Sequence, residues 1–166
     1  MLLRIAGMVN DSIVDGPGLR LAVFCQGCRR HCPGCHNPAT WDESGGYQAE
    51  TDDVLAAVGR NPLLDGITLT GGEPFLQAAA AAPLAAAVRA RGLTVVTYTG
   101  YLWEEITGGP PDWLELARQT DLLVDGPFIM GERNIDLLFR GSVNQRLIDA
   151  PASLAAGVPV AWRRFS

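Results

Sequence analysis

The sequence contains no lysine, since all 13 of its basic residues are arginine, and it contains only two histidines, His31 and His36. Without lysine the chain has no P-loop lysine, no Schiff-base nucleophile and no anchor for pyridoxal phosphate. Because both histidines fall in one short stretch, a Ser–His–Asp hydrolase has few places to assemble its triad. These absences remove several common classes of enzyme before any motif is considered.

Strong positive charge and long apolar runs are also missing. The net charge is −5, which argues against nucleic acid as the main partner. No apolar run reaches the roughly 18 residues of a membrane span, and the N-terminus lacks the basic and apolar regions of a secretory signal. We therefore expect a cytoplasmic protein that binds neither nucleic acid nor membrane.

Length and hydrophobic patterning predict the fold class. The 166 residues suit one domain over 1–166, whereas a full eight-fold βα-barrel takes roughly 250 residues. Strands are expected at 2–8, 19–24, 66–70, 94–98, 122–125, 146–149 and 158–162, and helices at 51–59, 75–91, 102–107 and 112–119. In the second of these helices, Pro83 marks a point where the helix can break. Strands that alternate with helices predict an α/β fold, an open, partial βα-barrel of about five βα units.

All four cysteines lie between positions 25 and 35, in the spacing C-x2-C-x3-C-x2-C. Disulfides are rare in a cytoplasmic chain, and zinc sites usually separate their two cysteine pairs by more than three residues. A ferredoxin-type electron carrier uses four thiolates, but its spacing has a different order. A fourth interpretation uses only Cys28, Cys32 and Cys35, and it leaves one iron of a cubane without a protein ligand, as a catalytic site requires.

The motifs around these cysteines resemble a known superfamily. Residues 28–35 read CRRHCPGC, which resembles the C-x3-C-x2-C signature of the radical S-adenosylmethionine superfamily. More narrowly, four further segments resemble those of enzymes that activate glycyl radical enzymes, and among these the activators of anaerobic ribonucleotide reductases. The segments are SIVDGPGLR at 12–20, GGEP at 71–74, VDGPF at 124–128 and RGSVNQR at 140–146. Gly34 precedes the last cysteine, where many superfamily members carry a larger side chain, and this subgroup also favours small residues there. The resemblance covers residues 11–149.

The resemblance implies one [4Fe–4S] cluster held by Cys28, Cys32 and Cys35, with S-adenosylmethionine bound to the fourth iron through its amino and carboxylate groups. Cys25 lies outside this motif, at the end of an apolar strand, and is expected to be a small buried thiol. Arg30, like its two neighbours in the cysteine spacer, is expected to lie on a solvated loop that could attract an acidic electron donor.

The cofactor-binding residues that the resemblance implies are Gly71, Gly72, Glu73, Pro74, Thr99 and Asp125. The two glycines would let the backbone approach the methionine part of the ligand, and Glu73 would place a charge near its ammonium group. The alternative for this motif is a plain strand-to-helix turn with Pro74 at the first helical position. Thr97, Thr99 and Tyr101 lie on or after a strand whose carboxyl end should face the same cavity, so that one of them could contact the adenosyl or carboxylate part, with ordinary strand packing as the alternative. Asp125 closes an apolar strand at the same rim, where it could orient the ligand or bind a cation.

The resemblance therefore implies a radical S-adenosylmethionine oxidoreductase. It would cleave its cosubstrate reductively to a 5′-deoxyadenosyl radical and abstract a glycine α-hydrogen in a partner glycyl radical enzyme such as anaerobic ribonucleotide reductase. Flavodoxin or ferredoxin would supply the electron. Two alternatives stay open: a small enzyme of the same superfamily that acts on another peptide or metabolite, and a non-enzymatic metal–thiolate module. The turn at 15–18 is expected at the mouth of the barrel, as part of the surface that docks the partner.

Overall fold

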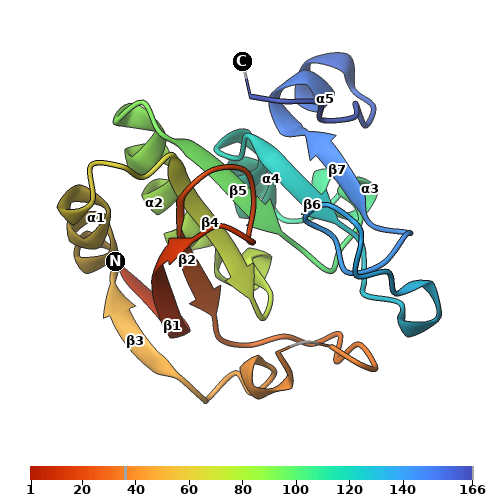
Figure 1. The fold of residues 1–166 in the computed structure, drawn as a ribbon, viewed down its shortest axis with the longest axis horizontal. Coiled ribbons are helices and arrows are strands. Elements are labelled where there is room, and N and C mark those ends of the chain that lie inside the picture. The colour runs from red at the N-terminus through yellow and green to blue at the C-terminus, as the bar shows by residue number, and fades with distance from the viewer. Residues whose placement is uncertain (36, 166) are drawn as a thin grey trace.

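The computed structural model describes residues 1–35 and 37–165, so that His36 and Ser166 lie outside it. Its strands form one sheet, shown in Figure 1. The strands are β1 (Leu2–Ser12), β2 (Arg20–Cys25), β3 (Tyr47–Glu50), β4 (Gly66–Gly71), β5 (Thr94–Tyr98), β6 (Leu122–Asp125) and β7 (Arg146–Asp149). The helices are α1 (Thr51–Arg60), α2 (Ala78–Ala90), α3 (Trp103–Thr107), α4 (Pro111–Arg118) and α5 (Ala150–Ala156), with short 3₁₀ turns at Pro38–Thr40, Pro74–Gln77 and Met130–Glu132.

The sheet has the strand order β3-β1-β2-β4-β5-β6-β7 and a parallel centre. Strands β2, β4, β5 and β6 pair in parallel, while β1, β3 and β7 pair antiparallel to their neighbours. The α/β class predicted from the sequence is confirmed. The expected five or so βα units are instead four parallel strands with three crossovers, because both ends of the sheet are completed by antiparallel strands.

Helices cover one face of this sheet and enclose the hydrophobic core. In β2, β4 and β5 the buried side chains on this face alternate along each strand, as in Leu21 and Val23 of β2. The alanine-rich helix α2 lies close to the sheet because its buried side chains are small. The possible break at Pro83 does not occur. The helix continues through this proline to Ala90, and the proline lies on the exposed side of α2. No helix among the described residues is long and apolar enough to cross a membrane.

On the opposite face of the sheet, described side chains fill the end where the parallel strands begin. Arg20 is fully buried there, and its guanidinium donates hydrogen bonds to Thr68, Pro17, Ile67 and Thr94. The apolar side chains of Val96, Leu122, Val124, Trp162 and Phe165 pack on the same face. This filling leaves open the half of the face near the carboxyl ends of the strands, where the cysteine-containing segment (orange in Figure 1) follows β2.

The tail of the chain differs from the sequence-based prediction. The strand expected at 158–162 is reduced to a single bridge between Ile148 and Ala161. Helix α5 and strand β3 were not among the elements expected from the sequence, and both are described here. The side chain of Asp149 caps α5 by accepting a hydrogen bond from the N–H of Ala152, and Gly157 ends this helix in a left-handed conformation.

Candidate functional site

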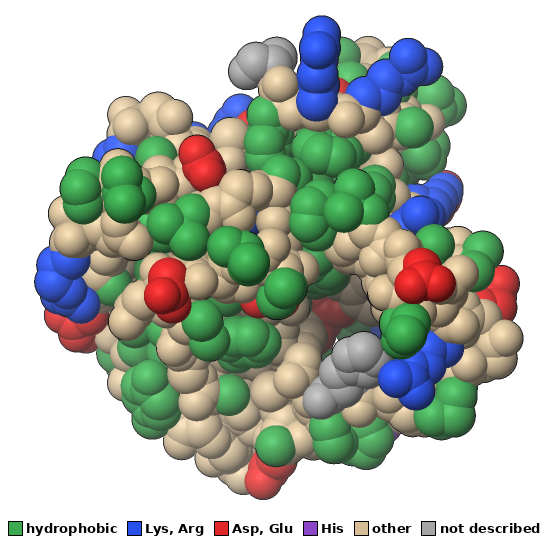
Figure 2. All heavy atoms as spheres, in the orientation of Figure 1, with side chains coloured by type: hydrophobic (Ala, Val, Ile, Leu, Met, Phe, Trp, Pro, Cys, Tyr) green, Lys and Arg blue, Asp and Glu red, His purple; other side chains and the backbone are tan. Residues whose placement is uncertain are grey.

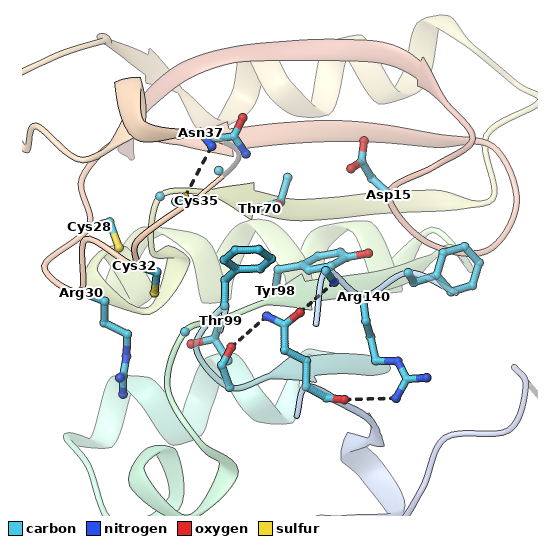
Figure 3. Close-up of a pocket in the computed structure, with 18 of the residues that line it drawn as sticks. Asp15, Cys28, Arg30, Cys32, Cys35, Asn37, Thr70, Tyr98, Thr99 and Arg140 are labelled. Carbon is cyan, nitrogen blue, oxygen red and sulfur yellow. Dashed lines mark hydrogen bonds between the residues drawn. The ribbon is translucent and has the colours of Figure 1, made fainter. Parts of the chain in front are cut away.

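A cavity of about 500 Å³ lies at the carboxyl ends of the parallel strands, shown in Figure 3. Its wall brings together segments that are far apart in the sequence. Among the lining residues are Cys28, Cys32, Cys35, Gly71, Gly72 and Thr99. The carboxyl ends of parallel strands are where α/β proteins commonly bind ligands, so the position of the cavity agrees with a binding role.

The three cysteines of the C-x3-C-x2-C motif are half-buried, free of disulfides, and on one wall of this cavity. The N–H of Asn37 donates to the sulfur of Cys35, at 3.4 Å, and the N–H of Cys35 donates to the carbonyl of Cys32, at 3.0 Å. Burial raises the pKa of the Cys28 thiol, and hydrogen bonds from the N–H groups of Arg30 and His31 oppose this effect. Within the described part of the chain no three metal-binding side chains are yet gathered closely enough to hold one ion.

Cys25 is separated from the other three. It is fully buried, and as the last residue of β2 it lies on the same alternating face as Leu21 and Val23, toward the helices. Burial raises the pKa of its thiol to about 12, with a smaller contribution from Glu73. The sequence-based prediction of a buried thiol at this position is confirmed.

The glycines of the GGEP motif pack the end of β4 directly against the end of β2. Gly71 has a φ of +91°, and a Cβ there would lie 2.7 Å from the backbone N and O of Cys25. A Cβ at Gly72 would overlap the carbonyl oxygen of Gly27. Because any side chain would separate the two strand ends, this contact requires glycine whether or not a ligand binds beside it.

Glu73 is 1% exposed and does not line the cavity. Its carboxylate accepts hydrogen bonds from the N–H of Gly100 at 2.7 Å, the N–H of Phe75 at 3.1 Å, and the hydroxyl of Thr99 at 2.9 Å. Burial raises the pKa of Glu73 to about 7, while these donors oppose the shift. The carboxylate thus joins the ends of β4 and β5, and a position of Glu73 beside a ligand ammonium group stays a prediction.

Of two predicted site residues next to Glu73, Pro74 belongs to a turn and Thr99 lines the cavity. Pro74 is buried and does not line the cavity, since it begins the 3₁₀ turn that leads into α2, as in the plain-turn alternative. Thr99 does line the cavity, and its hydroxyl oxygen also accepts a hydrogen bond from the N–H of Tyr101 at 3.1 Å. Of the predicted ligand-binding residues, the structure therefore brings Gly71, Gly72 and Thr99 to the cavity wall.

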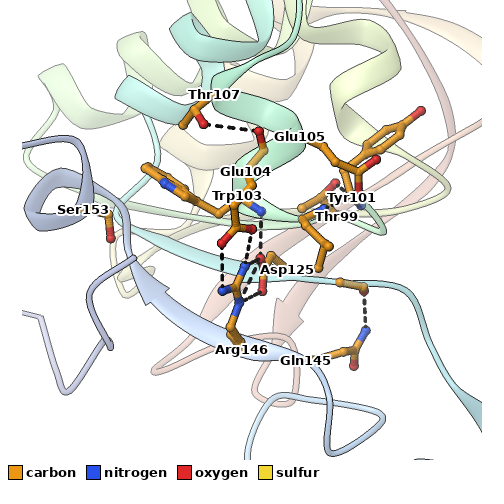
Figure 4. Close-up of polar contacts among 12 residues, drawn as sticks. Thr99, Tyr101, Trp103, Glu104, Glu105, Thr107, Asp125, Gln145, Arg146 and Ser153 are labelled. Carbon is orange, nitrogen blue, oxygen red and sulfur yellow. Dashed lines mark hydrogen bonds and ion pairs between the residues drawn. The ribbon is translucent and has the colours of Figure 1, made fainter. Parts of the chain in front are cut away.

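Asp125 is fully buried at the end of β6 but faces other protein groups, as Figure 4 shows. One carboxylate oxygen accepts a hydrogen bond from the N–H of Trp103, at 2.8 Å, at the start of α3. The guanidinium of Arg146 binds both carboxylate oxygens and also pairs with Glu104 at 2.9 Å. This side chain does not line the cavity and joins β6, β7 and α3, and a role for Asp125 in orienting a ligand or binding a cation stays a prediction.

Three residues that line the cavity were not predicted from the sequence to bind the ligand. Tyr98, Arg30 and Arg140 all line the cavity. The Nε atoms of both arginines are buried and have no hydrogen-bond partner among the described residues. Figure 3 shows these two side chains at different sides of the cavity, and a guanidinium that lines a cavity suits an anionic ligand group such as a carboxylate. Arg140 lies in the RGSVNQR segment, which the sequence analysis quoted only for its resemblance.

The segment 126–145 packs against residues 28–35, which contain the three motif cysteines and are called the cysteine loop below. Gly34 has a φ of +76°, and a Cβ there would overlap the side chain of Met130 and lie 3.3 Å from that of Phe128. The side chain of Gln145 holds this segment together through the carbonyl of Gly126 and the N–H of Gly141. The positive φ favours glycine at position 34, and a larger residue there would also displace the flexible end of the Met130 side chain, in agreement with the small residue in the cysteine motif.

Comparison with known proteins finds a matching family and several relatives of this chain. Residues 14–148 match the family described as 4Fe-4S single cluster domain. The anaerobic ribonucleoside-triphosphate reductase-activating protein of Enterobacteria phage T4 is 34% identical over 142 residues, covering 81% of this chain and 86% of that protein. The protein of the same name from Escherichia coli (strain K12) is 32% identical over 141 residues, covering 80% of this chain and 90% of that protein.

Two further similarities cover less of the other protein. The pyruvate formate-lyase-activating enzyme of Clostridium pasteurianum is 33% identical over 127 residues, which span 73% of this chain and 50% of that enzyme. The crystal structure of QueE from Escherichia coli aligns with a TM-score of 0.49 at 21% identity, over 60% of this chain and 53% of that one. A structural similarity of that size supports no conclusion about function.

Proposed function

The chain belongs to the 4Fe-4S single cluster domain family and to the radical S-adenosylmethionine activating enzymes of glycyl radical enzymes, and from this membership we propose that it activates an anaerobic ribonucleotide reductase. The observation that carries the proposal is the cavity itself. It collects the three thiols of the C-x3-C-x2-C motif, the glycines that end β4 and the threonine that follows β5 on one surface.

The residues present fit the iron–sulfur cluster that the family implies. Cys28, Cys32 and Cys35 offer three free thiols on one wall, and backbone N–H groups donate to the sulfur atoms of Cys28 and Cys35. Hydrogen bonds to sulfur are one means by which proteins stabilise such clusters and tune their potential. We assign these three cysteines as ligands and leave Cys25 out, because it is buried on the other face of the sheet.

S-adenosylmethionine also fits the cavity. The volume of the cavity, about 500 Å³, falls within the range of small-molecule sites. The guanidinium groups of Arg30 and Arg140 line the cavity and would attract the ligand's carboxylate, and the backbone of Gly71 and Gly72 also lines it, where carbonyl oxygens would accept hydrogen bonds from the ammonium group. When bound, the cluster supplies the electron that cleaves S-adenosylmethionine to methionine and a 5′-deoxyadenosyl radical, which takes the glycine α-hydrogen of the partner.

The rim of the cavity carries apolar side chains that suit a protein partner. Val14, on the segment between β1 and β2, and Ile135, on the segment 126–145, both line the cavity and are 73% and 81% exposed. Their neighbours Ile13 and Leu138 are 72% and 60% exposed. Figure 2 shows a hollow in this face with hydrophobic side chains on either side of it. We assign this rim as the surface that docks the glycine-bearing segment of the reductase, and we keep flavodoxin or ferredoxin as the proposed electron donor.

Charged substitutions on the rim should separate docking from cofactor chemistry. The double variant Ile13→Asp/Leu138→Asp, at two exposed rim positions that do not line the cavity, is expected to lower glycyl radical formation on the reductase about tenfold at subsaturating concentrations, since lost apolar contact of about 1.4 kcal/mol is tenfold in affinity. Formation of 5′-deoxyadenosine with dithionite in the absence of the reductase should stay unchanged. The measurements are the glycyl doublet by EPR and 5′-deoxyadenosine by chromatography.

Leu63→Asp is the matched control, because Leu63 is 76% exposed and does not line the cavity. This control should leave both readouts at the wild-type level. An Ile13→Asp/Leu138→Asp variant that still activates the reductase fully would remove the rim from the proposal while leaving the cofactor site intact.

A further inference from the structure

Arg30 differs from the solvated loop residue that the sequence suggested. It lies in the spacer between Cys28 and Cys32, and its side chain is 27% exposed, against 68% for the adjacent Arg29. Its Nη2 atom donates to Glu105 of α3 at 2.9 Å. Its guanidinium carbon lies 4.8 Å from the centre of the Tyr101 ring, a cation–π distance.

The path of this side chain is fixed by its surroundings. A Cβ at Gly100 would lie 2.7 Å from the Cδ of Arg30, so the arginine passes directly over this glycine. The N–H of Gly100 is in turn bound by the buried carboxylate of Glu73. Figure 3 shows Arg30 extending from the cysteine loop along the wall of the cavity. Arg30 therefore connects the cysteine loop with the end of β5 and with α3.

The charges around Arg30 only partly neutralise it. Glu105 pairs with it, but its side chain is 44% exposed, so water screens the pair. Glu73 also interacts with Arg30, although its raised pKa weakens its negative charge near neutral pH. The other charged residues that line the cavity are Asp15, Arg133 and Arg140. A guanidinium held in a partly buried wall acts more strongly on nearby charge than one in water.

We propose that Arg30 is a positioning residue that holds the Cys28–Cys32 spacer against α3 and raises the reduction potential of the cluster bound by this loop. The oxidised cluster accepts one electron and becomes more negative by one charge, and a fixed cation nearby favours that reduced form. The inference rests on the proposed function only in requiring that the cysteine loop binds a cluster. It does not depend on the identity of the protein partner.

The test is a redox titration of the anaerobically reconstituted protein, followed by EPR of the reduced cluster, without S-adenosylmethionine. Arg30→Gln should shift the midpoint to a more negative potential. At the wild-type midpoint the ratio of reduced to oxidised cluster should fall about tenfold, which is 59 mV for one electron. Arg29→Gln is the matched control, because it removes the same charge from the same spacer at an exposed position. It should change that ratio less than about twofold, since solvent and salt screen an exposed charge.

Two further variants separate charge from packing. Glu105→Gln leaves Arg30 without its counter-charge and should shift the potential in the opposite, positive direction. Arg30→Lys keeps the charge but loses the planar contact with Tyr101, so it should restore most of the wild-type potential. Iron content per chain and the circular dichroism spectrum check that each variant is folded and loaded.

Equal shifts in Arg30→Gln and Arg29→Gln, or shifts of the same sign in Arg30→Gln and Glu105→Gln, would overturn the proposal. If Arg30→Gln does not retain its cluster, Arg30→Lys and Glu105→Gln still decide the matter through the size and sign of their shifts. The test measures the reduction potential of the cluster and does not measure activation of the reductase. A result that overturns the role of Arg30 would therefore leave the proposed function standing, and the potentials could still be measured if the protein did not activate a reductase.

Discussion

Replacing Cys32 by alanine is expected to lower the formation of 5′-deoxyadenosine to about 1% of the wild-type rate or less, because a cluster that has three protein ligands cannot lose one without losing its binding or geometry. Cys32 is the middle cysteine of the motif, and its thiol shares the cavity wall with those of Cys28 and Cys35. The measurement is 5′-deoxyadenosine released with dithionite and S-adenosylmethionine, together with iron and sulfide per chain. The wild-type protein should be brown and carry about four irons per chain.

Cys25→Ala is the matched control for this prediction. Because Cys25 is buried in the core on the other face of the sheet, its replacement should cost about 1 kcal/mol of unfolding free energy and leave the iron content and the reaction in place. Two results would contradict the assignment. One is a Cys32→Ala protein that keeps four irons and normal cleavage, and the other is a Cys25→Ala protein that loses the cluster while remaining folded.

Asp125→Ala is expected to lower the free energy of unfolding by about 3 kcal/mol, since it breaks a buried ion pair and removes the acceptor at the start of α3. Asp125 is fully buried, and its carboxylate binds the N–H of Trp103 and the guanidinium of Arg146. Arg146 keeps its second partner, Glu104, so the loss should stay near the lower end of values for buried pairs. Urea denaturation monitored by tryptophan fluorescence measures the change.

Glu104→Ala provides the comparison, because it removes the other carboxylate of the same arginine at a position that is 56% exposed. Its cost should stay below about 1 kcal/mol, as for most exposed ion pairs. At a temperature where Asp125→Ala is fully folded, its affinity for S-adenosylmethionine should equal that of the wild type. Unchanged stability combined with lost ligand binding would restore the ligand role that the sequence suggested for Asp125.

The parts of the fold that were predicted correctly depend on strong local patterns. The buried strands β4, β5 and β6 are short apolar runs, and each was expected within about one residue of its observed bounds. Strand β3 was missed because its residues, YQAE, are mostly exposed and show no apolar alternation. It forms through pairing with β1, which a local pattern does not reveal. Helix α5 was missed although Asp149 and Gly157 are ordinary capping residues.

The site residues that could be predicted from the sequence are those whose residue type and spacing together form a recognisable motif. The cysteine motif and the two glycines lead directly to the cavity wall. The structural partner of Asp125 was missed because nothing local indicates that Arg146, 21 residues later in the chain, pairs with it across β6 and β7. Arg30 was described as solvated for the same reason, since its partner Glu105 is 75 residues away. Tertiary partners decide whether a charged side chain faces a ligand or another part of the protein.

The most direct test of the proposed activation is transfer of deuterium from the partner. The reduced protein is mixed with S-adenosylmethionine and an anaerobic ribonucleotide reductase whose glycines carry deuterium at the α-carbon. We expect a glycyl EPR signal on the reductase and one deuterium in each 5′-deoxyadenosine, in a ratio of one product to one radical. 5′-Deoxyadenosine that forms without deuterium and without a glycyl signal would contradict the proposal and favour a different peptide or metabolite as the substrate.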